Sequence, residues 1–121
     1  DRGIAVIVEF DVPGHATAWC TGYPEACPSP SCQSPLNVAS NATFDLIAAV
    51  LNDTATRFPF DFVHMGGDEV NYDCWSNTPA VAAWLRARNM TVEDAYAYFV
   101  QRVHDLVFAQ QRQVGQPAKK K

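Results

Sequence analysis

The run of apolar residues at positions 4–10, IAVIVEF, constrains the fold of this chain more than any other segment. It is nearly continuous and rich in β-branched side chains, a pattern that is typical of a strand buried on both faces of a parallel sheet. A second apolar run, at residues 60–65, ends at Gly66-Gly67 and predicts another short strand. The sequence therefore predicts a parallel sheet whose strands need cover on both faces.

Apolar residues recur at helical spacing in three further segments. Thr43 is expected to cap a first helix, which ends before Phe58-Pro59. A second helix is expected from residue 79 to about residue 88, and a third follows Thr91. Residues 12–42 hold most of the eight prolines and three of the four cysteines, and they predict a long loop. The alternation of strands and helices predicts an α/β fold with a parallel sheet.

The length and composition describe one small globular domain. The 121 residues are 48% hydrophobic and 18% charged, and the net charge of −4 argues against nucleic acid as a partner. No apolar run is long enough for a membrane span. The chain begins with neither a signal peptide nor Met, so we expect an internal piece of a longer protein. Residues 116–121 end in three lysines and are expected to form a disordered or artefactual tail.

The cysteines and glycosylation acceptors predict the compartment. The four cysteines form no CxxC pair and fit no common zinc framework. An even number of cysteines, together with three N-x-S/T acceptors, predicts the secretory route, where disulfides form. The alternative is that the thiols are free and buried and the acceptors are unused. The residues concerned are Cys20, Cys27, Cys32, Cys74, Asn41, Asn52 and Asn89.

Acidic and histidine side chains gather at the ends of both predicted strands, where α/β folds place reactive residues. Asp68 and Glu69 are neighbours, and the two glycines before them allow a backbone in which both carboxyl groups enter one pocket. Two such groups repel when both are charged, which suits a general acid beside an anionic partner. The alternative is that one of them caps the following turn. The residues at the two strand ends are Glu9, Asp11 and His15, and His64, Asp68 and Glu69.

Two motifs resemble one enzyme family. Residues 9–19, EFDVPGHATAW, and residues 64–75, HMGGDEVNYDCW, are similar to the core motifs of glycoside hydrolase family 20, the β-N-acetylhexosaminidases. Residues 22–36 resemble its plant-type members, and the likeness covers roughly residues 2–113. It implies an α/β fold that is part of a (β/α)8 TIM barrel, with the two predicted strands as its third and fourth. Residues 1–115 would then form a partial catalytic domain.

The resemblance also implies a reaction and the roles of four residues. Terminal β-linked N-acetylglucosamine or N-acetylgalactosamine is removed with retention, and the substrate's own acetamido oxygen replaces an enzyme nucleophile. Glu69 is implied as the general acid, and Asp68 as the residue that orients the acetamido group and offsets the charge of the oxazolinium ion. His15 would form a hydrogen bond toward the acid and tune its proton affinity, and Asp11 would support the pocket. The family implies neither a cofactor nor a metal.

Further implications concern disulfides, partners and compartment. A Cys32–Cys74 disulfide is implied by the plant-type members, which leaves Cys20 and Cys27 to pair with each other. The partners would be glycans that end in N-acetylhexosamine, and the compartment extracellular, vacuolar or lysosomal. Glu9, His64 and the three tryptophans (Trp19, Trp75 and Trp84) are expected to be structural.

Two other functions stay open on the residues alone. A barrel needs about 250 residues and eight strands, so we expect this chain to be inactive by itself. One alternative is therefore a non-catalytic sugar-binding or interaction fragment. The other is a metalloenzyme with hard ligands from both strand ends, namely Asp11, His15, His64, Asp68 and Glu69.

Overall fold

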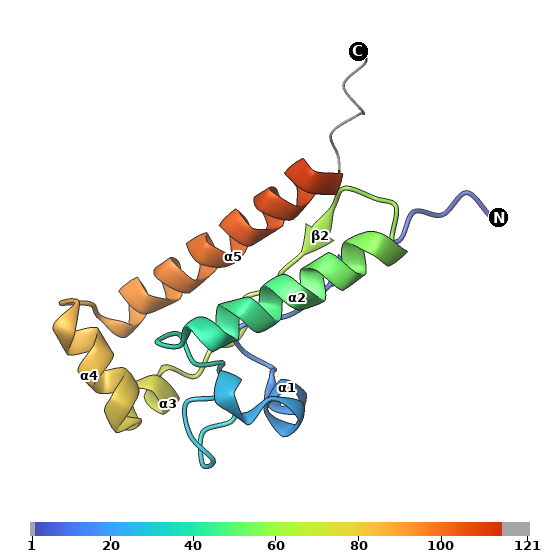
Figure 1. The fold of residues 1–121 in the computed structure, drawn as a ribbon. Helices are drawn as coiled ribbons and strands as arrows, with labels where there is room; N and C mark the ends of the chain where they lie inside the picture. Colours follow the sequence, from blue (N-terminus) through green and yellow to red (C-terminus); the bar gives the residue numbers. More distant parts are fainter. Residues whose placement is uncertain (1, 115–121) are drawn as a thin grey trace.

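The computed structural model describes residues 2–114, with side chains for residues 2–110. Helices make up most of this part of the chain, and one two-stranded sheet joins its two halves (Figure 1). The elements in chain order are β1 (Val8–Glu9), α1 (Thr17–Gly22), the 3-10 helix η1 (Pro24–Ala26), α2 (Asn41–Arg57), β2 (Val63–His64), α3 (Tyr72–Asn77), α4 (Pro79–Ala87) and α5 (Val92–Val114). The expected tail at residues 116–121 lies outside the described residues.

The two strands pair in parallel, which confirms the predicted direction of the sheet. Val8 lies opposite Val63, and Glu9 lies opposite His64. Two backbone hydrogen bonds continue the pairing beyond the strands, from Phe10 N to the His64 carbonyl (2.9 Å) and from Val12 N to the Met65 carbonyl (3.1 Å). The polypeptide therefore leaves both strands at the same end of the sheet.

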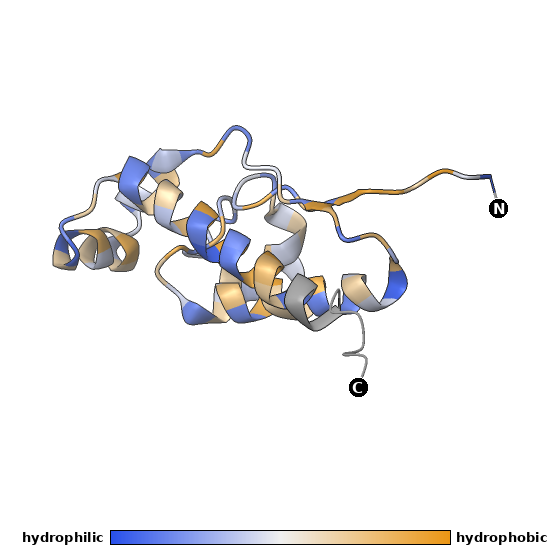
Figure 2. Cartoon of the chain, turned by 90° about the horizontal axis from the view of Figure 1, so that it is seen from above, coloured by the Kyte–Doolittle hydropathy of each residue, from blue (hydrophilic) through white to orange (hydrophobic). Residues whose placement is uncertain are grey.

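The strands are much shorter than the apolar runs that predicted them. Ile4 is 75% exposed and Ile7 is 59% exposed, although this run was expected to be buried on both faces. Figure 2 shows the apolar stretch running from the body of the fold toward the N-terminus. The prediction of burial is wrong for the described residues because no third strand and no second helical layer among them covers this run. The described fold by itself does not establish barrel units.

Helices α2 and α5 lie side by side, run in the same direction and build most of the core (Figure 1). The Phe44 and Phe99 rings meet with their centroids 5.2 Å apart. Burial of each such apolar side chain contributes about 1.5–3 kcal/mol to stability. The predicted helical spacing is confirmed, because the buried positions repeat every three or four residues. They are Phe44, Ile47 and Leu51 in α2, and Ala95, Phe99 and Val103 in α5.

Thr43 does not cap α2, contrary to expectation. The helix begins earlier, at Asn41, and Thr43 is fully buried within its first turn. Its hydroxyl donates to the Ala26 carbonyl across 3.3 Å. A threonine close to a helix start therefore serves here to tie α2 to η1.

The segment expected to be a long loop contains two short helical elements, α1 and η1. Both disulfides are present, Cys20–Cys27 within this segment and Cys32–Cys74 between it and α3. The fully buried Trp75 adds a third tie, because its indole Nε1 donates to the Leu36 carbonyl at 2.9 Å. The sequence missed α3, which Asn71 caps by accepting from Asp73 N at 3.1 Å. No helix in the described part is both long and apolar enough to cross a membrane.

Candidate active site

The carboxylate of Asp11 joins the two strand ends. Asp11 follows β1, and its Oδ1 accepts from Gly67 N at 2.8 Å and from Asp68 N at 3.3 Å, both in the segment after β2. A charged acceptor makes each of these hydrogen bonds stronger than a neutral pair would be. The parallel pairing therefore brings both sequence motifs into one site, as their position at strand ends predicted.

Two glycines make this close approach possible. Gly66 has φ +65° and Gly67 has φ +110°, in the region that side chains disfavour. A Cβ on Gly66 would collide with the carboxyl group of Asp11, and one on Gly67 would lie 2.7 Å from the Tyr96 hydroxyl. The glycines are thus needed for backbone angle and for space.

His15 lies between two carboxyl groups. Its Nε2 is 3.9 Å from Asp11 Oδ2 and 3.9 Å from Glu69 Oε1. Both distances exceed hydrogen-bond range, so these contacts are electrostatic and require a protonated ring. The hydrogen bond from His15 to Glu69 that the resemblance implied is therefore not formed in this structure, although the two side chains are neighbours.

The backbone is strained at both His15 and Glu69. Their φ angles are +49° and +50°, which non-glycine residues rarely adopt, and such conformations cost about 1–3 kcal/mol each. Gly14 lies against the same segment, because a Cβ on it would be 2.8 Å from the Asp68 carbonyl. The two turns that carry the candidate catalytic residues therefore pack directly on each other.

The candidate acid faces solvent. The side chain of Glu69 is 84% exposed and that of His15 is 53% exposed, whereas Asp11 is only 26% exposed. Asp68 is exposed as well. The site thus offers the carboxyl groups of two consecutive residues and an imidazole that lies near the Glu69 and Asp11 carboxyl groups.

His64 holds the start of the turn formed by Gly66 and Gly67, called the glycine turn below. Its Nδ1 accepts from Gly66 N at 3.0 Å and also lies 3.4 Å from Glu9 Oε1. The first contact needs an unprotonated Nδ1 and the second becomes an ion pair only when the ring is protonated. The structural role expected for His64 and Glu9 thus takes the form of support for the turn that precedes Asp68.

The structure adds Tyr96 of α5, which the sequence analysis did not single out. Its hydroxyl donates to the Gly67 carbonyl at 2.8 Å, so α5 reaches the same turn. The one signal in the sequence is a tyrosine on the apolar face of a predicted helix, because a buried tyrosine hydroxyl usually finds a polar partner.

The metal alternative finds no ligand group in the described part of the chain. Among residues 2–110, no cluster of three His, Cys, Asp or Glu side chains is placed to hold a metal ion. His64 pairs with Glu9, while His15 lies with Asp11 and Glu69. The five side chains named for this alternative are thus not gathered around one point.

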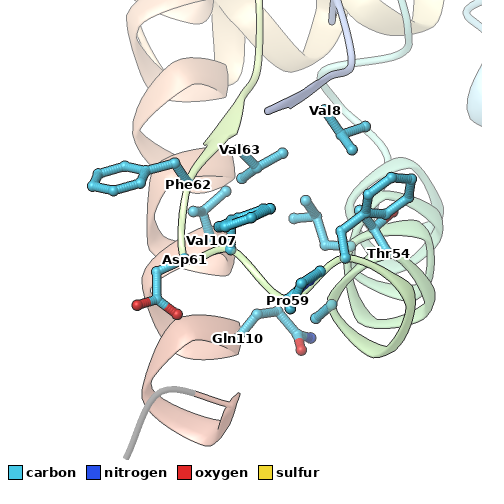
Figure 3. Close-up of a pocket in the computed structure, with 12 residues that line it drawn as sticks. Val8, Thr54, Pro59, Asp61, Phe62, Val63, Val107 and Gln110 are labelled. Carbon is cyan, nitrogen blue, oxygen red and sulfur yellow. The ribbon is translucent and has the colours of Figure 1, made fainter. Parts of the chain in front are cut away.

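A partly open pocket lies near the other end of β2, and Figure 3 shows its lining. Its volume is about 60 Å³, whereas sites for small ligands usually measure about 300–1,000 Å³. Apolar side chains from α2, α5 and residues 58–63 form most of the wall, with Asp61 and Gln110 among the polar members. Its size and lining do not suit a sugar.

Comparison with known proteins gives a consistent result. The family described as "Glycosyl hydrolase family 20, catalytic domain" matches residues 1–116. Beta-hexosaminidase 1 of Arabidopsis thaliana is 54% identical over 108 residues, and Beta-hexosaminidase 3 of the same plant is 50% identical over 108 residues. Each match covers 89% of this chain and 20% of the plant protein. The chain thus spans about a fifth of the length of these curated relatives.

A solved structure shares the fold of the described residues. It is the crystal structure of an exo β-N-acetylglucosaminidase from Vibrio harveyi in complex with N-acetylglucosamine. The TM-score is 0.79 at 28% identity, and the match covers 90% of this chain and 19% of that one. The likeness therefore extends from sequence to three-dimensional arrangement.

The hydrogen bond from Gly66 N predicts the tautomer of His64. At neutral pH, ¹⁵N NMR of the imidazole should show Nδ1 without a proton and Nε2 with one. In His64→Phe the acceptor is lost, and the Gly66 amide resonance should shift. A proton on Nδ1 at neutral pH would contradict this geometry.

Proposed function

This chain belongs to glycosyl hydrolase family 20, and from that membership we propose that it is part of a β-N-acetylhexosaminidase. Such an enzyme removes terminal β-linked N-acetylglucosamine or N-acetylgalactosamine from glycans. The observation that carries the proposal is the Asp11 carboxylate, which binds the Gly67 and Asp68 amides and so unites the two motifs. Because the chain spans about a fifth of its relatives, the activity is proposed for a longer protein that contains it.

The proposed fold of that protein is a (β/α)8 barrel in which β1 and β2 are the third and fourth strands. The parallel pairing of the strands supports this assignment, and so does the TM-score of 0.79. The exposed apolar side chains at residues 4–7 support it too, since further strands and helices would cover them. In this proposal residues 1–115 form the partial catalytic domain, and residues 116–121 are a tail outside it.

The proposed reaction uses the substrate's own acetamido oxygen as the nucleophile. That oxygen attacks the anomeric carbon while the bond to the leaving oxygen breaks, and Glu69 donates its proton to the leaving oxygen. The product of this step is a cyclic oxazolinium ion. Glu69, now ionised, then takes a proton from water, whose oxygen attacks the anomeric carbon and reopens the ring. Each step returns the glutamate to the form that the next one needs.

Asp68 is proposed to bind the acetamido N–H and to offset the positive charge of the oxazolinium ion. A charged acceptor is the strongest partner for that group, and its value is greatest where the positive charge develops. The position of Asp68 directly beside Glu69 supports this role, because one sugar ring can contact both. Its backbone N–H is already bound to Asp11, which limits the orientations of the residue.

His15 and Asp11 are proposed to support the pair. A protonated His15 at 3.9 Å would stabilise the ionised form of Glu69 after proton donation. Asp11 uses Oδ1 for the two amides and presents Oδ2 to His15 at 3.9 Å. Asp11 therefore serves the turn and the imidazole with its two oxygens.

We further propose that the protein follows the secretory route and acts on N-acetylhexosamine-terminated glycans in an extracellular, vacuolar or lysosomal compartment. The two disulfides support the route, since they persist in oxidising environments. The three glycosylation acceptors, Asn41, Asn52 and Asn89, are all exposed, which a modified asparagine requires.

A non-catalytic sugar-binding or interaction role for residues 1–121 alone is the second candidate. The 84% exposure of Glu69 favours it, because a general acid works in a pocket that excludes water. A thiazoline that mimics the oxazolinium ion separates the two proposals. Binding that depends on Asp68 supports the catalytic proposal, and binding that is indifferent to Asp68→Asn supports the second candidate.

The acid role of Glu69 predicts a dependence on the leaving group. In the full-length protein, Glu69→Gln should lower kcat by roughly 10²–10⁴-fold on substrates with poor leaving groups. It should affect glycosides of acidic phenols much less, because these leave without a proton. Steady-state kinetics on both substrate types measures the difference, with exposed Glu25→Gln as the control. An equal loss on both types would refute the assignment.

The charge role of Asp68 predicts the opposite pattern. Asp68→Asn should lower kcat on good and poor leaving groups alike, by roughly 10²–10³-fold, because the oxazolinium ion loses its counter-charge. The variant should also bind the thiazoline more weakly. Asp45→Asn on the exposed side of α2 is the matched control. Retention of activity on good leaving groups would argue against this role.

The open site predicts that the chain alone is a poor enzyme. Purified residues 1–121 should release no measurable nitrophenol from a nitrophenyl N-acetylglucosaminide under conditions in which the full-length protein is active. The reason is that a whole barrel builds its site from the ends of several strands, and the described part has two. Robust turnover by the purified chain would show that the described residues suffice.

A further inference from the structure

The peptide unit between Gly67 and Asp68 is held at both of its polar ends. Its carbonyl oxygen accepts from the Tyr96 hydroxyl at 2.8 Å, and its N–H donates to Asp11 Oδ1 at 3.3 Å. The two partners come from α5 and from the segment after β1, so they hold the unit from different elements. This is the last peptide unit before the two candidate catalytic carboxyl groups.

The backbone at this point has unusual freedom to rotate. Gly66 and Gly67 adopt φ angles of +65° and +110°, and glycine reaches many alternative conformations at little cost. Rotation of the peptide plane between Gly67 and Asp68 would redirect the Asp68 side chain. It would also move Glu69, which sits at a strained φ of +50°. A flexible hinge directly before these residues therefore needs an external restraint.

Tyr96 is well placed to provide that restraint. It lies in α5 next to Ala95 and one turn before Phe99, both fully buried in the core. Its ring contacts the Tyr72 ring, with centroids 6.1 Å apart and an interplanar angle of 61°. Burial, with smaller contributions from Tyr96 and Glu93, raises the pKa of the Tyr72 phenol. The hydroxyl of Tyr96 is thus fixed by a packed helix.

We propose that Tyr96 is a positioning residue whose hydroxyl locks the Gly67–Asp68 peptide plane and thereby aims Asp68 at the acetamido group of the sugar. This inference rests on the function proposed above. Tyr96 touches no reacting atom and acts through Asp68. A phenylalanine at this position keeps the ring contacts of α5 and removes only the donor to the Gly67 carbonyl.

The first test compares two tyrosines of the same helix in the full-length protein. Tyr96→Phe should lower kcat roughly tenfold to a hundredfold, as expected when a catalytic group is misplaced. The loss should be similar for good and poor leaving groups and should be matched by weaker thiazoline binding. Tyr98→Phe is the control, since its hydroxyl contacts Arg102 at 3.0 Å and not the glycine turn. Equal kinetics for the two variants would overturn the inference.

The second test separates positioning from general loss of structure. In an Asp68→Asn background, Tyr96→Phe should cost little further activity, because residues that act as one unit are not additive. Independent losses that multiply would show that Tyr96 acts elsewhere and would overturn the inference. A wild-type protein without hexosaminidase activity would instead refute the proposed function. An active wild type whose Tyr96→Phe and Tyr98→Phe variants match would refute the inference alone.

Discussion

One carboxylate determines the geometry of this site. Asp11 accepts two backbone amides from a segment 56 residues away and leaves its second oxygen beside His15. Gly66 must be glycine because any side chain there would meet this carboxyl group. The strand pairing brings the two segments together, and Asp11 converts that proximity into a fixed relation between His15, Asp68 and Glu69. Backbone strain at His15 and Glu69 is tolerated because these contacts hold both turns in place.

The site is supported by layers of decreasing burial. The packed faces of α2 and α5 carry Tyr96, which reaches the glycine turn, and the turn presents Glu69 to solvent. The Cys32–Cys74 disulfide and the Trp75–Leu36 hydrogen bond hold the first loop against α3. The exposed carboxyl groups are thus held in place by contacts that lead inward to the helical core. Such an arrangement suits a site whose chemistry depends on the orientation of two adjacent side chains.

Local sequence patterns predicted part of this fold correctly. The rest depends on contacts between residues that are distant in the sequence. The spacing of Phe44, Ile47 and Leu51 predicted one face of α2 correctly, and the parallel sheet followed from the strand–helix order. The strands proved shorter than their apolar runs because strand length depends on neighbours, which a local pattern does not describe. Thr43 does not cap α2 because its hydroxyl forms a tertiary hydrogen bond with η1 instead. Tyr96 escaped notice for the same reason, since its partner lies 29 residues away.

The short pairing of β1 and β2 has a consequence for handling this polypeptide. Each strand has one hydrogen-bonded neighbour in the described part of the chain, so its other side presents an open ladder edge. The side chains of Ile4 and Ile7, in the segment before β1, are exposed as well. Open edges beside apolar side chains recruit strands from other molecules, a common origin of insoluble deposits. Residues 1–121 produced by themselves are therefore prone to aggregate, and fusion to a soluble partner protein is a sensible precaution.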